Sequence, residues 1–338
     1  MSRNDKKAIA RDAGPSNPTM ADLAELAGLS KITVSRALSD SPLVNLETRE
    51  RIQALARQHG YKLNINARNL RLRRSHTVAV IVEMKPSTDR TMFDPYPLIL
   101  LGGISQELTA AGYSVLLTTR QGASAAAVQS ADGLILLGQG VHQDAVRRFD
   151  KLGLPMVVWG ASSSGDAHVV VGSDNALGGA AVAAHFIAQG RRHPVFIGNP
   201  SHPEIYQRLN GFVDALALHG VKPLLMRRDD FTPDSGAEAV YSLHARKVRF
   251  DAIFACSDLL AMGAIRATLE LGHAIPKEVS VVGYDDMPLG ASFLPPLSSV
   301  RQDWQEGGIL LARKLLALIH GQSAQSEMLP VSLIVRAT

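Results

Sequence analysis

Positions 31–36, near the N-terminus, carry side chains suited to binding a nucleic acid. An arginine can donate two hydrogen bonds to a guanine edge, and an isoleucine can contact the methyl group of thymine. Hydroxyl groups and the amides at a helix amino end suit phosphate oxygens. A solvated helix face would carry similar residues. If 31–38 is a helix with Val34, Ala37 and Leu38 inward, the outward residues are Lys31, Ile32, Thr33, Ser35 and Arg36.

Cap residues around these positions predict a helix-turn-helix. Thr19 can cap a helix over 20–27, and Gly28 follows its last apolar position, where glycine tolerates a positive φ. Ser30 can then cap the helix over 31–38, which leaves a turn of about three residues. In that motif the second helix enters the major groove, so its outward face is the one that would meet DNA.

A third helix and a basic segment follow. Asn45 can cap a helix over 46–59, whose apolar positions complete a small shared core. The segment 63–75 is rich in arginine and has few apolar residues at helical spacing, which predicts a helix that forms only on DNA. Leu70 in this segment is a candidate wedge for a minor-groove base step. An exposed linker is the alternative interpretation.

Charge is distributed unevenly along the 338 residues. Residues 1–76 hold 14 Lys and Arg against 7 Asp and Glu, whereas the remaining residues hold 21 against 24. A basic head on a weakly acidic body predicts that the head binds a polyanion. The alternative is a basic stretch without a role. We expect residues 1–18 to be a disordered basic tail.

Composition excludes several classes of protein. Apolar residues make up 46% and charged residues 20% of the chain, as in ordinary globular proteins. The chain has no apolar run of about 18 residues, and its first twenty residues lack the apolar core of a secretory signal. Cys256 is the only cysteine, which excludes a disulfide framework and a multi-cysteine zinc site. We therefore expect a cytoplasmic protein with no metal, cofactor or membrane partner.

Beyond residue 76, short apolar runs alternate with amphipathic stretches, the first of them a helix near 98–111. Continuous apolar strands separated by helices indicate parallel sheets covered on both faces, and roughly ten strands exceed one small sheet. The predicted fold is α/β, with two doubly wound parallel-sheet lobes preceded by a small all-α head. Ligands in such sheets bind at the carboxyl ends of strands. In this chain those ends include VWGAS, GSDN, ACSD and GYDD. Glycine motifs for a dinucleotide or a P-loop phosphate are missing.

Residues 19–61, together with the sequence NARNLR at 66–71, resemble the LacI/GalR family of bacterial transcription regulators. The run VSRAL and the pattern A-R-x-L carry the resemblance. It implies that the chain divides into a helix-turn-helix domain at 19–62, a hinge helix at 63–75, and a body at 76–338. The body is expected to bind an effector between two lobes, as in a periplasmic sugar-binding protein, and to form the dimer.

The resemblance also implies which residues contact DNA. Hinge helices of two subunits pair in the minor groove and open a central base step, a role that falls on Leu70. Leu63 departs from the family, which often has proline before the hinge. Lys31 and Ile32 occupy positions that vary with operator sequence, so the operator cannot be inferred. The candidate DNA-binding residues are Thr19, Lys31, Ile32, Thr33, Ser35, Arg36, Asn66, Ala67, Arg68, Asn69 and Leu70.

The body's resemblance implies an effector cleft with specific side chains. Arg208 in RLNGF matches the family's arginine that reaches into the cleft, and Asp285 in VVGYDD follows a strand. Ser257 stands where the family usually has asparagine, which leaves the effector's identity open. Aromatic rings can stack on the C–H face of a sugar while Asp and Arg bind its hydroxyls. The candidate effector residues are Asp94, Tyr96, Trp159, Arg208, Phe231, Ser257, Asp258, Asp285 and Trp304.

Structural roles are the alternatives for these residues. Arg208 could be a surface ion-pair partner, Asp285 could cap a turn, and both Phe231 and Trp304 could be ordinary core. Asp285 and Asp286 together could do acid–base chemistry, but adjacent residues on one turn usually point apart.

The expected function is that of a sequence-specific repressor of carbohydrate-utilisation genes, controlled by a sugar-like effector. Two heads must meet two half-sites, so we expect a homodimer on a pseudo-palindromic double-stranded operator. A leucine heptad that could extend the assembly does not follow the last strand. The alternatives are a regulator that responds to a nucleoside, a purine or another metabolite, a sugar-acting enzyme, and a solute-binding protein of a transporter.

Overall fold

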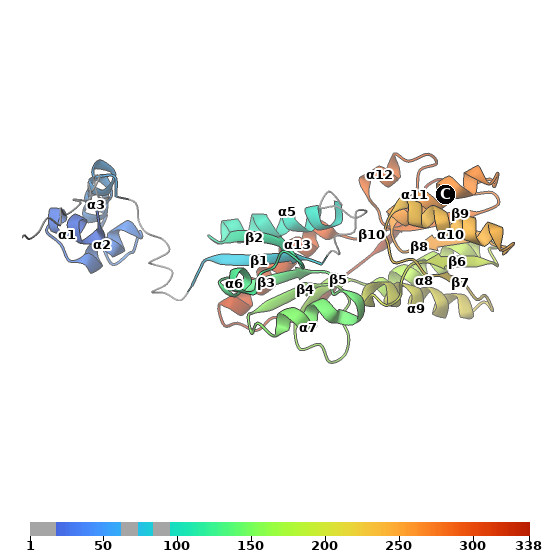
Figure 1. Cartoon of the computed structure of the whole chain (residues 1–338), viewed down its shortest axis with the longest axis horizontal. Helices are drawn as coiled ribbons and strands as arrows, with labels where there is room; N and C mark the ends of the chain where they lie inside the picture. The colour runs from blue at the N-terminus through green and yellow to red at the C-terminus, as the bar shows by residue number, and fades with distance from the viewer. Residues whose placement is uncertain (1–17, 62–73, 84–94) are drawn as a thin grey trace, which may run out of the picture. The chain divides into compact units, whose positions relative to one another are not determined.

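The computed structural model describes residues 18–61, 74–83 and 95–338 of the chain. The chain divides into two compact units, Met1–Arg73 and Arg74–Thr338, which are described separately (Figure 1). Among the predicted site residues, the hinge positions 66–70 and Asp94 lie outside the described residues. Within the described ranges, we find no helix long and apolar enough to cross a membrane.

The first unit contains three helices that begin where the cap residues predict. Helix α1 (Met20–Ala27) is capped by Thr19, and helix α2 (Lys31–Leu38) by Ser30. Helix α3 (Leu46–Gln58) is capped by Asn45 and ends one residue before the predicted end. The predictions of a helix-turn-helix and a third helix are therefore confirmed.

A small apolar core holds these three helices together. Leu23, Val34 and Ile52, one from each helix, are fully buried in it, and Ala37 of α2 is buried beside them. Because α2 commits Val34 and Ala37 to this core, its opposite face is turned to solvent. Gly28 takes a φ of +64° at the end of α1, as predicted for the sharp turn into α2.

The second unit contains two six-stranded sheets, each in its own lobe. The first sheet, in lobe 1, has the strand order β11-β5-β4-β3-β1-β2, and the second, in lobe 2, has the order β12-β10-β9-β8-β6-β7. All neighbouring strands are parallel except β10 and β12. The first sheet consists of β1 (Thr77–Val82), β2 (Ser114–Thr119), β3 (Gly133–Leu137), β4 (Met156–Trp159), β5 (Val169–Ser173) and β11 (Glu327–Leu329). The second consists of β6 (Pro194–Ile197), β7 (Leu224–Met226), β8 (Ala252–Ala255), β9 (Ser280–Asp285), β10 (Ser298–Arg301) and β12 (Ser332–Ile334).

Helices cover both faces of each sheet, as the uninterrupted apolar strands predict. Figure 1 shows α5 along one side of the first sheet and α7 along the other. Lobe 1 has α5 (Pro95–Ala110), α6 (Ala125–Gln129), the short 3₁₀ helix η1 (Val141–Gln143), α7 (Asp144–Asp150) and α13 (Trp304–Ile319). Lobe 2 has α8 (Asn175–Ala188), α9 (Pro203–Ala217), α10 (Pro233–Ala245), α11 (Asp258–Glu270) and α12 (Pro288–Ala291).

Strand β1 illustrates why both faces are apolar. Val78, Val80 and Val82 pack into the cluster that includes side chains of α5 and α13, whereas Ala79 and Ile81 pack into the cluster on the opposite face. Successive side chains of a strand point to opposite faces, so a strand buried on both sides must be apolar throughout.

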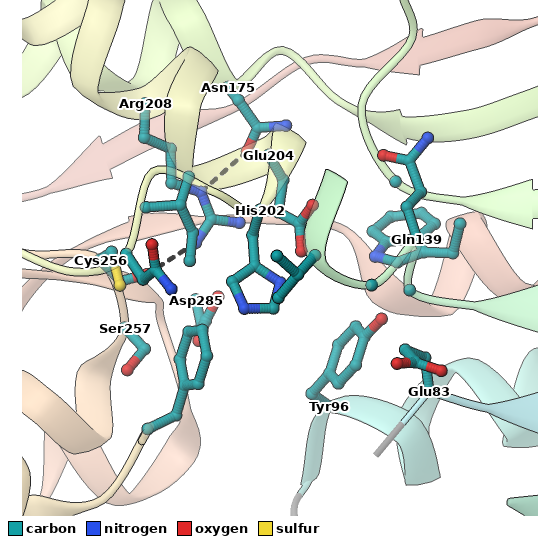
Figure 2. A pocket seen from close by; sticks show the side chains of 18 of the residues that line it. Glu83, Tyr96, Gln139, Asn175, His202, Glu204, Arg208, Cys256, Ser257 and Asp285 are labelled. Atoms are coloured by element: carbon teal, nitrogen blue, oxygen red, sulfur yellow. Dashed lines mark hydrogen bonds between the residues drawn. The ribbon is translucent and has the colours of Figure 1, made fainter. Parts of the chain in front are cut away.

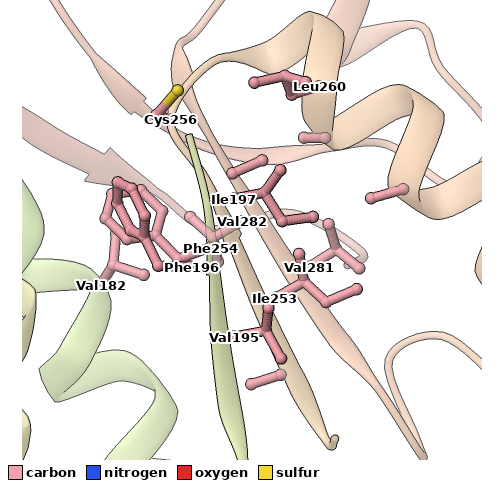
Figure 3. Packing of buried hydrophobic residues seen from close by; sticks show 14 of the residues in the cluster. Val182, Val195, Phe196, Ile197, Ile253, Phe254, Cys256, Leu260, Val281 and Val282 are labelled. Atoms are coloured by element: carbon pink, nitrogen blue, oxygen red, sulfur yellow. The ribbon is translucent and has the colours of Figure 1, made fainter. Parts of the chain in front are cut away.

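The same packing recurs in lobe 2. Figure 3 shows Phe196 and Phe254, on neighbouring strands, beside Val182 of α8. Ile253 and Val281 lie on the other side of this sheet, toward α11 (Figure 3). The two phenylalanine rings meet edge to face, with their centroids 5.2 Å apart. Each sheet is therefore packed in its own apolar core.

The chain crosses between the lobes three times. It passes from β5 to α8, from β10 to α13, and from β11 to β12. The strands at these crossings lie at one edge of each sheet, β11 and β5 in the first and β12 and β10 in the second. In two-lobed proteins, changes in a few backbone angles at such connections can tilt one lobe against the other.

The strands that the apolar pattern does not reveal are short. Strands β7, β10 and β11 have three or four residues each, and β7 and β11 expose part of their length. Three residues are too few for an apolar run to be distinguished from a loop, and β10, with the sequence SSVR, has no apolar run. Helix α5 is found close to its predicted range of 98–111, beginning three residues earlier.

Helices α5 and α13 approach closely because glycines lie at their contact. A Cβ atom on Gly103 would lie 2.6 Å from the carbonyl oxygen of Gln305, and one on Gly308 would lie 2.3 Å from that of Leu100. Real Cβ atoms do not approach backbone this closely, so the two helices must separate if either glycine acquires a side chain. Gly102, the neighbour of Gly103, faces open space.

We therefore predict that Gly103→Ala lowers the stability of this unit by about 1–3 kcal/mol through overpacking, a loss of several degrees in Tm. Gly102→Ala is the matched control and should be neutral or slightly stabilising, because alanine favours helix at an exposed position. Thermal unfolding followed by circular dichroism measures both. Equal Tm values for the two variants would contradict the assigned packing of α5 against α13.

Candidate functional site

The outward face of α2 is the first candidate site. Lys31, Ile32 and Arg36 are exposed, and Thr33 and Ser35 are half-buried beside them. Ile32 exposes 61% of its surface. Two cations flank this apolar side chain, so the face can bind phosphates and also contact a base methyl group.

Two of the predicted DNA-binding residues, Thr19 and Thr33, also form hydrogen bonds at the amino ends of α1 and α2. The Thr19 hydroxyl and backbone amide both donate to Asp22, at 2.9 and 2.8 Å, and these bonds lower the pKa of that carboxyl. Thr33 lies with its hydroxyl 2.9 Å from that of Ser30 at the start of α2. Thr33 lies in the first turn of α2, which has no acidic side chain, so backbone amides there can bind an anion, whereas Asp22 already accepts the Thr19 amide at the start of α1.

The second candidate site is a cavity of about 290 Å³ between the two lobes. Most of its lining residues stand at or just after the carboxyl ends of β1–β5 in lobe 1 and of β6–β10 in lobe 2. This is the edge of a parallel sheet where ligands bind, so the position agrees with the expectation from the sequence. Figure 2 shows Tyr96 and Glu83 on one side, with Arg208, Ser257 and Asp285 on the other.

The Arg208 side chain in the cavity wall is fixed by two hydrogen bonds and a cation–π contact. Its Nε donates to the Asn175 side chain at 2.8 Å, and its Nη1 donates to the carbonyl oxygen of Cys256 at 2.6 Å (Figure 2). Its guanidinium carbon lies 3.6 Å from the ring centre of Tyr284, a cation–π contact. Burial opposes the charged form, but neighbouring groups that include Asp285 raise the pKa of Arg208, so the guanidinium stays charged.

Close helix packing sets the position of Arg208 in α9. A Cβ atom on Gly179 of α8 would lie 2.0 Å from the carbonyl oxygen of Arg208, and one on Gly211 of α9 would lie 2.0 Å from that of Ala176. The backbones of the two helices therefore touch directly. This contact brings Arg208 within reach of Asn175, the first residue after the chain enters lobe 2.

Asp285 and Asp286 diverge at the end of β9, as expected for neighbours on one turn. Asp285 lines the cavity and accepts a hydrogen bond from Gln302 at 2.7 Å. Asp286 turns away and forms ion pairs with Arg301 and Arg336. Both aspartates have a positive φ, 117° and 51°, a conformation that costs about 1–3 kcal/mol per residue and that these contacts hold in place.

Aromatic side chains line the cavity from both lobes. Tyr96, at the start of α5, contributes from lobe 1, and Phe231 contributes from lobe 2. The ring of Phe231 packs edge-on against His202, with centroids 5.9 Å apart. Trp159 reaches the cavity but is largely buried, because its ring packs on Gly307 of α13.

Two of the predicted effector residues do not line the cavity. Asp258 is fully buried and its carboxylate accepts hydrogen bonds from the Met287 amide and the Ser299 hydroxyl, while burial and then the charge of Asp285 raise its pKa. Trp304 is buried behind Tyr96, which it contacts edge-on at a centroid distance of 5.6 Å. Asp258 therefore links Met287, just after β9, to Ser299 of β10, and Trp304 packs against Tyr96. Ser257 does line the cavity while capping α11.

A charged cluster that the sequence motifs do not predict lines the cavity on the lobe 1 side. Arg120 bridges two carboxylates, with Nη1 2.7 Å from Glu83 and Nη2 2.7 Å from Asp144. Gly140, with a φ of +73°, passes so close that a Cβ atom would lie 2.2 Å from Asp144. Burial raises the pKa of Glu83, although the bond from Arg120 opposes this.

Other polar lining residues were also missed. They share one signal, because nearly all of them stand within a few residues of a strand's carboxyl end. Inspection of every strand end for polar side chains, rather than only the family motifs, would have found most of them. They include Gln139, Asn175, Asn199, His202, Glu204, Asp229, Asp230, Thr232 and Gln302.

Comparison with known proteins gives matches to both units. Residues 19–64 match the bacterial regulatory proteins of the lacI family, and residues 183–338 match a periplasmic binding protein-like domain. The HTH-type transcriptional regulator CelR of Thermobifida fusca is 32% identical over 332 residues, which cover 94% of this chain and 95% of the relative.

Solved structures agree with these matches. The lac repressor dimer bound to operator and the anti-inducer ONPF matches with a TM-score of 0.81 and 26% identity, over 95% of this chain and 98% of that one. The complex of the transcriptional regulator CelR with cellobiose matches with a TM-score of 0.70 and 30% identity, over 95% and 99%. The chain therefore belongs to the LacI family of bacterial regulatory proteins and is a DNA-binding transcriptional regulator.

Proposed function

We propose that this regulator is a repressor of carbohydrate-utilisation genes whose operator affinity changes when a sugar occupies the inter-lobe cavity. The observation that carries the proposal is the shared lining of that cavity. Side chains of both lobes face one ligand-sized space, so a ligand there contacts two bodies that can move relative to each other.

The coupling follows from differential binding. A ligand shifts an equilibrium between two lobe arrangements only if it binds one of them more tightly. In the arrangement described, the His142 amide donates to the Ser201 carbonyl at 2.9 Å, and the Gln207 side chain donates to the Ser162 carbonyl at 2.9 Å. These two contacts link lobe 1 to lobe 2 beside the cavity. A sugar bonded to both lobes would favour the arrangement that keeps them.

The chemistry of the lining supports a carbohydrate. The rings of Tyr96 and Phe231 can stack on the C–H face of a pyranose, and Arg208 and Asp285 can bind hydroxyls through charge-assisted hydrogen bonds. The CelR structure in complex with cellobiose adds support by similarity. We propose Tyr96, Trp159, Arg208, Phe231, Ser257 and Asp285 as effector-binding residues, with Asp94 remaining a sequence-based proposal.

On the DNA side, we propose that Lys31, Ile32 and Arg36 contact an operator, with α2 in the major groove. The hinge contacts at 66–70, including the wedge role of Leu70, remain proposals from the sequence. Two half-sites require two heads, so we propose a homodimer on a pseudo-palindromic operator, as in the lac repressor dimer. Such a protein would act in the cytoplasm, where its operator is.

We infer no catalytic role. Asp285 and Asp286 diverge, so they do not form the paired carboxylates that acid–base catalysis of sugar hydrolysis requires. Turnover of any bound sugar by the purified protein would contradict this inference.

The direct test uses the purified protein and palindromes upstream of its own gene and of its neighbouring genes. Fluorescence anisotropy should show binding at low salt that weakens steeply as salt increases, because phosphate contacts release counterions. Adding mono- and disaccharides one at a time should then change the operator affinity for one of them. A nucleoside that acted where sugars did not would replace the carbohydrate with the alternative effector class.

For the DNA-binding face, we predict that Arg36→Ala weakens operator binding about 10- to 100-fold, the effect of losing one base or phosphate contact. Arg57→Ala is the matched control, since it removes the same charge from exposed α3 and should change the affinity less than threefold. Anisotropy titrations at several salt concentrations measure both. If both variants lost affinity equally, Arg36 would contribute only general charge.

For the cavity, we predict that Arg208→Ala abolishes the effector response while the operator affinity without effector stays within threefold. Loss of a charged hydrogen-bond donor should weaken sugar binding at least tenfold. Arg266→Ala, at an exposed ion pair in the same lobe, is the control and should respond normally. Because Arg208 also supports Asn175 and Tyr284, Asp285→Asn provides a second, size-matched variant. A normal dose response in both Arg208→Ala and Asp285→Asn would remove these residues from the site.

A further inference from the structure

We propose that the cavity selects its effector by charge: it accepts neutral or amine-bearing sugars and rejects sugar acids and sugar phosphates. This inference rests on the proposed function and specifies the class of ligand for the same site. It is carried by the balance of charges in the lining, by buried acceptors, and by the helix ends that face the cavity.

Carboxylates outnumber cations around the cavity. The described lining residues include two arginines, Arg120 and Arg208, and no lysine. A negatively charged ligand would therefore meet an excess of like charge in a partly enclosed space, where screening by salt is weak. The carboxylates in the lining are those of Glu83, Asp144, Glu204, Asp229, Asp230 and Asp285.

Both guanidinium groups already have carboxylate neighbours that offset their charge. Arg120 is already bonded to two carboxylates, so its charge is more than balanced locally. Arg208 has Nε and Nη1 committed to Asn175 and Cys256, with Asp285 as a charged neighbour. A site built for a phosphate or carboxylate would instead present an arginine fork to the ligand.

Buried acceptors in the lining require donors. Among the described residues, the Glu83 Oε2, Asp144 Oδ1 and Glu204 Oε2 atoms are buried and have no hydrogen-bond partner. The Glu83 side chain is only 9% exposed, and Figure 2 shows it facing the cavity across from Glu204. A buried acceptor without a donor is costly. Sugar hydroxyls and ammonium groups are donors, whereas an ionised acid or phosphate group adds only further acceptors.

Two of the helix ends at the cavity carry acidic side chains of their own. Helix α7 has Asp144 in its first turn and α9 has Glu204, and both side chains line the cavity. An acidic side chain in the first turn already balances the partial positive charge of the helix amino end. Anion binding at such ends, common in phosphate sites, is therefore opposed in this cavity.

The experiment compares matched sugars on the full-length protein by isothermal titration calorimetry at low salt. The sets are cellobiose with cellobionate, glucose with glucosamine and glucuronate, and ribose with ribose 5-phosphate. Within the set that binds, we expect the neutral or amine form to bind at least tenfold more tightly than the anionic form. Raising the salt concentration should change this ratio only slightly, because charges in a partly enclosed space are screened less than exposed charges.

A charge variant tests the cause. Glu204→Gln removes one carboxylate with little change in shape, so the ratio of neutral to anionic affinity should fall about tenfold. Glu238→Gln is the matched control, since Glu238 is exposed on α10 and outside the cavity lining, and the ratio should stay unchanged. An unchanged ratio in Glu204→Gln would overturn the electrostatic explanation.

The outcomes separate the two proposals. If an anionic sugar binds as tightly as its neutral partner or more tightly, and changes operator affinity, charge selection is wrong while the sugar-responsive function stands. If no sugar of any set binds or changes operator affinity, the proposed function fails and the charge proposal is withdrawn with it.

Discussion

The buried guanidinium of Arg208 is the interaction on which the cavity depends. It ties together Asn175 at the entry of the chain into lobe 2, the carbonyl group at the end of β8, and the ring of Tyr284 on β9. Burial raises the pKa of Tyr284 to about 12, so the ring stays neutral beneath the cation. A charge buried in this way is tolerated only because its partners are in place, and their positions therefore determine one another.

Close glycine contacts give the lobes the stiffness that this arrangement requires. Backbone touches backbone between α8 and α9 at Gly179 and Gly211, and between α5 and α13 at Gly103 and Gly308. With each lobe stiff, the three crossings are where relative motion would be concentrated. A ligand between stiff bodies can then be coupled to DNA binding through small rotations, without local unfolding.

Unusual backbone conformations and charged side chains occur together at the carboxyl end of β9. Asp285 has a φ of 117°, and the carboxylate of Asp286, turned away from the cavity, is held by Arg301 and Arg336. Residues in sparsely populated conformations persist where the surrounding contacts over-determine them, which is common in ligand sites.

The sequence alone determined the three helices of the head, their caps, and the two-lobed parallel-sheet class, because caps and apolar runs are local signals. It also identified Arg208, Tyr96 and Asp285, which stand in recognisable motifs and line the cavity. Only the tertiary structure decided that Asp258 and Trp304 lie behind the lining and that Glu83, Arg120 and Asp144 converge on it. Those residues are distant in sequence, and the side to which each points depends on strand order and helix packing, which no local pattern encodes.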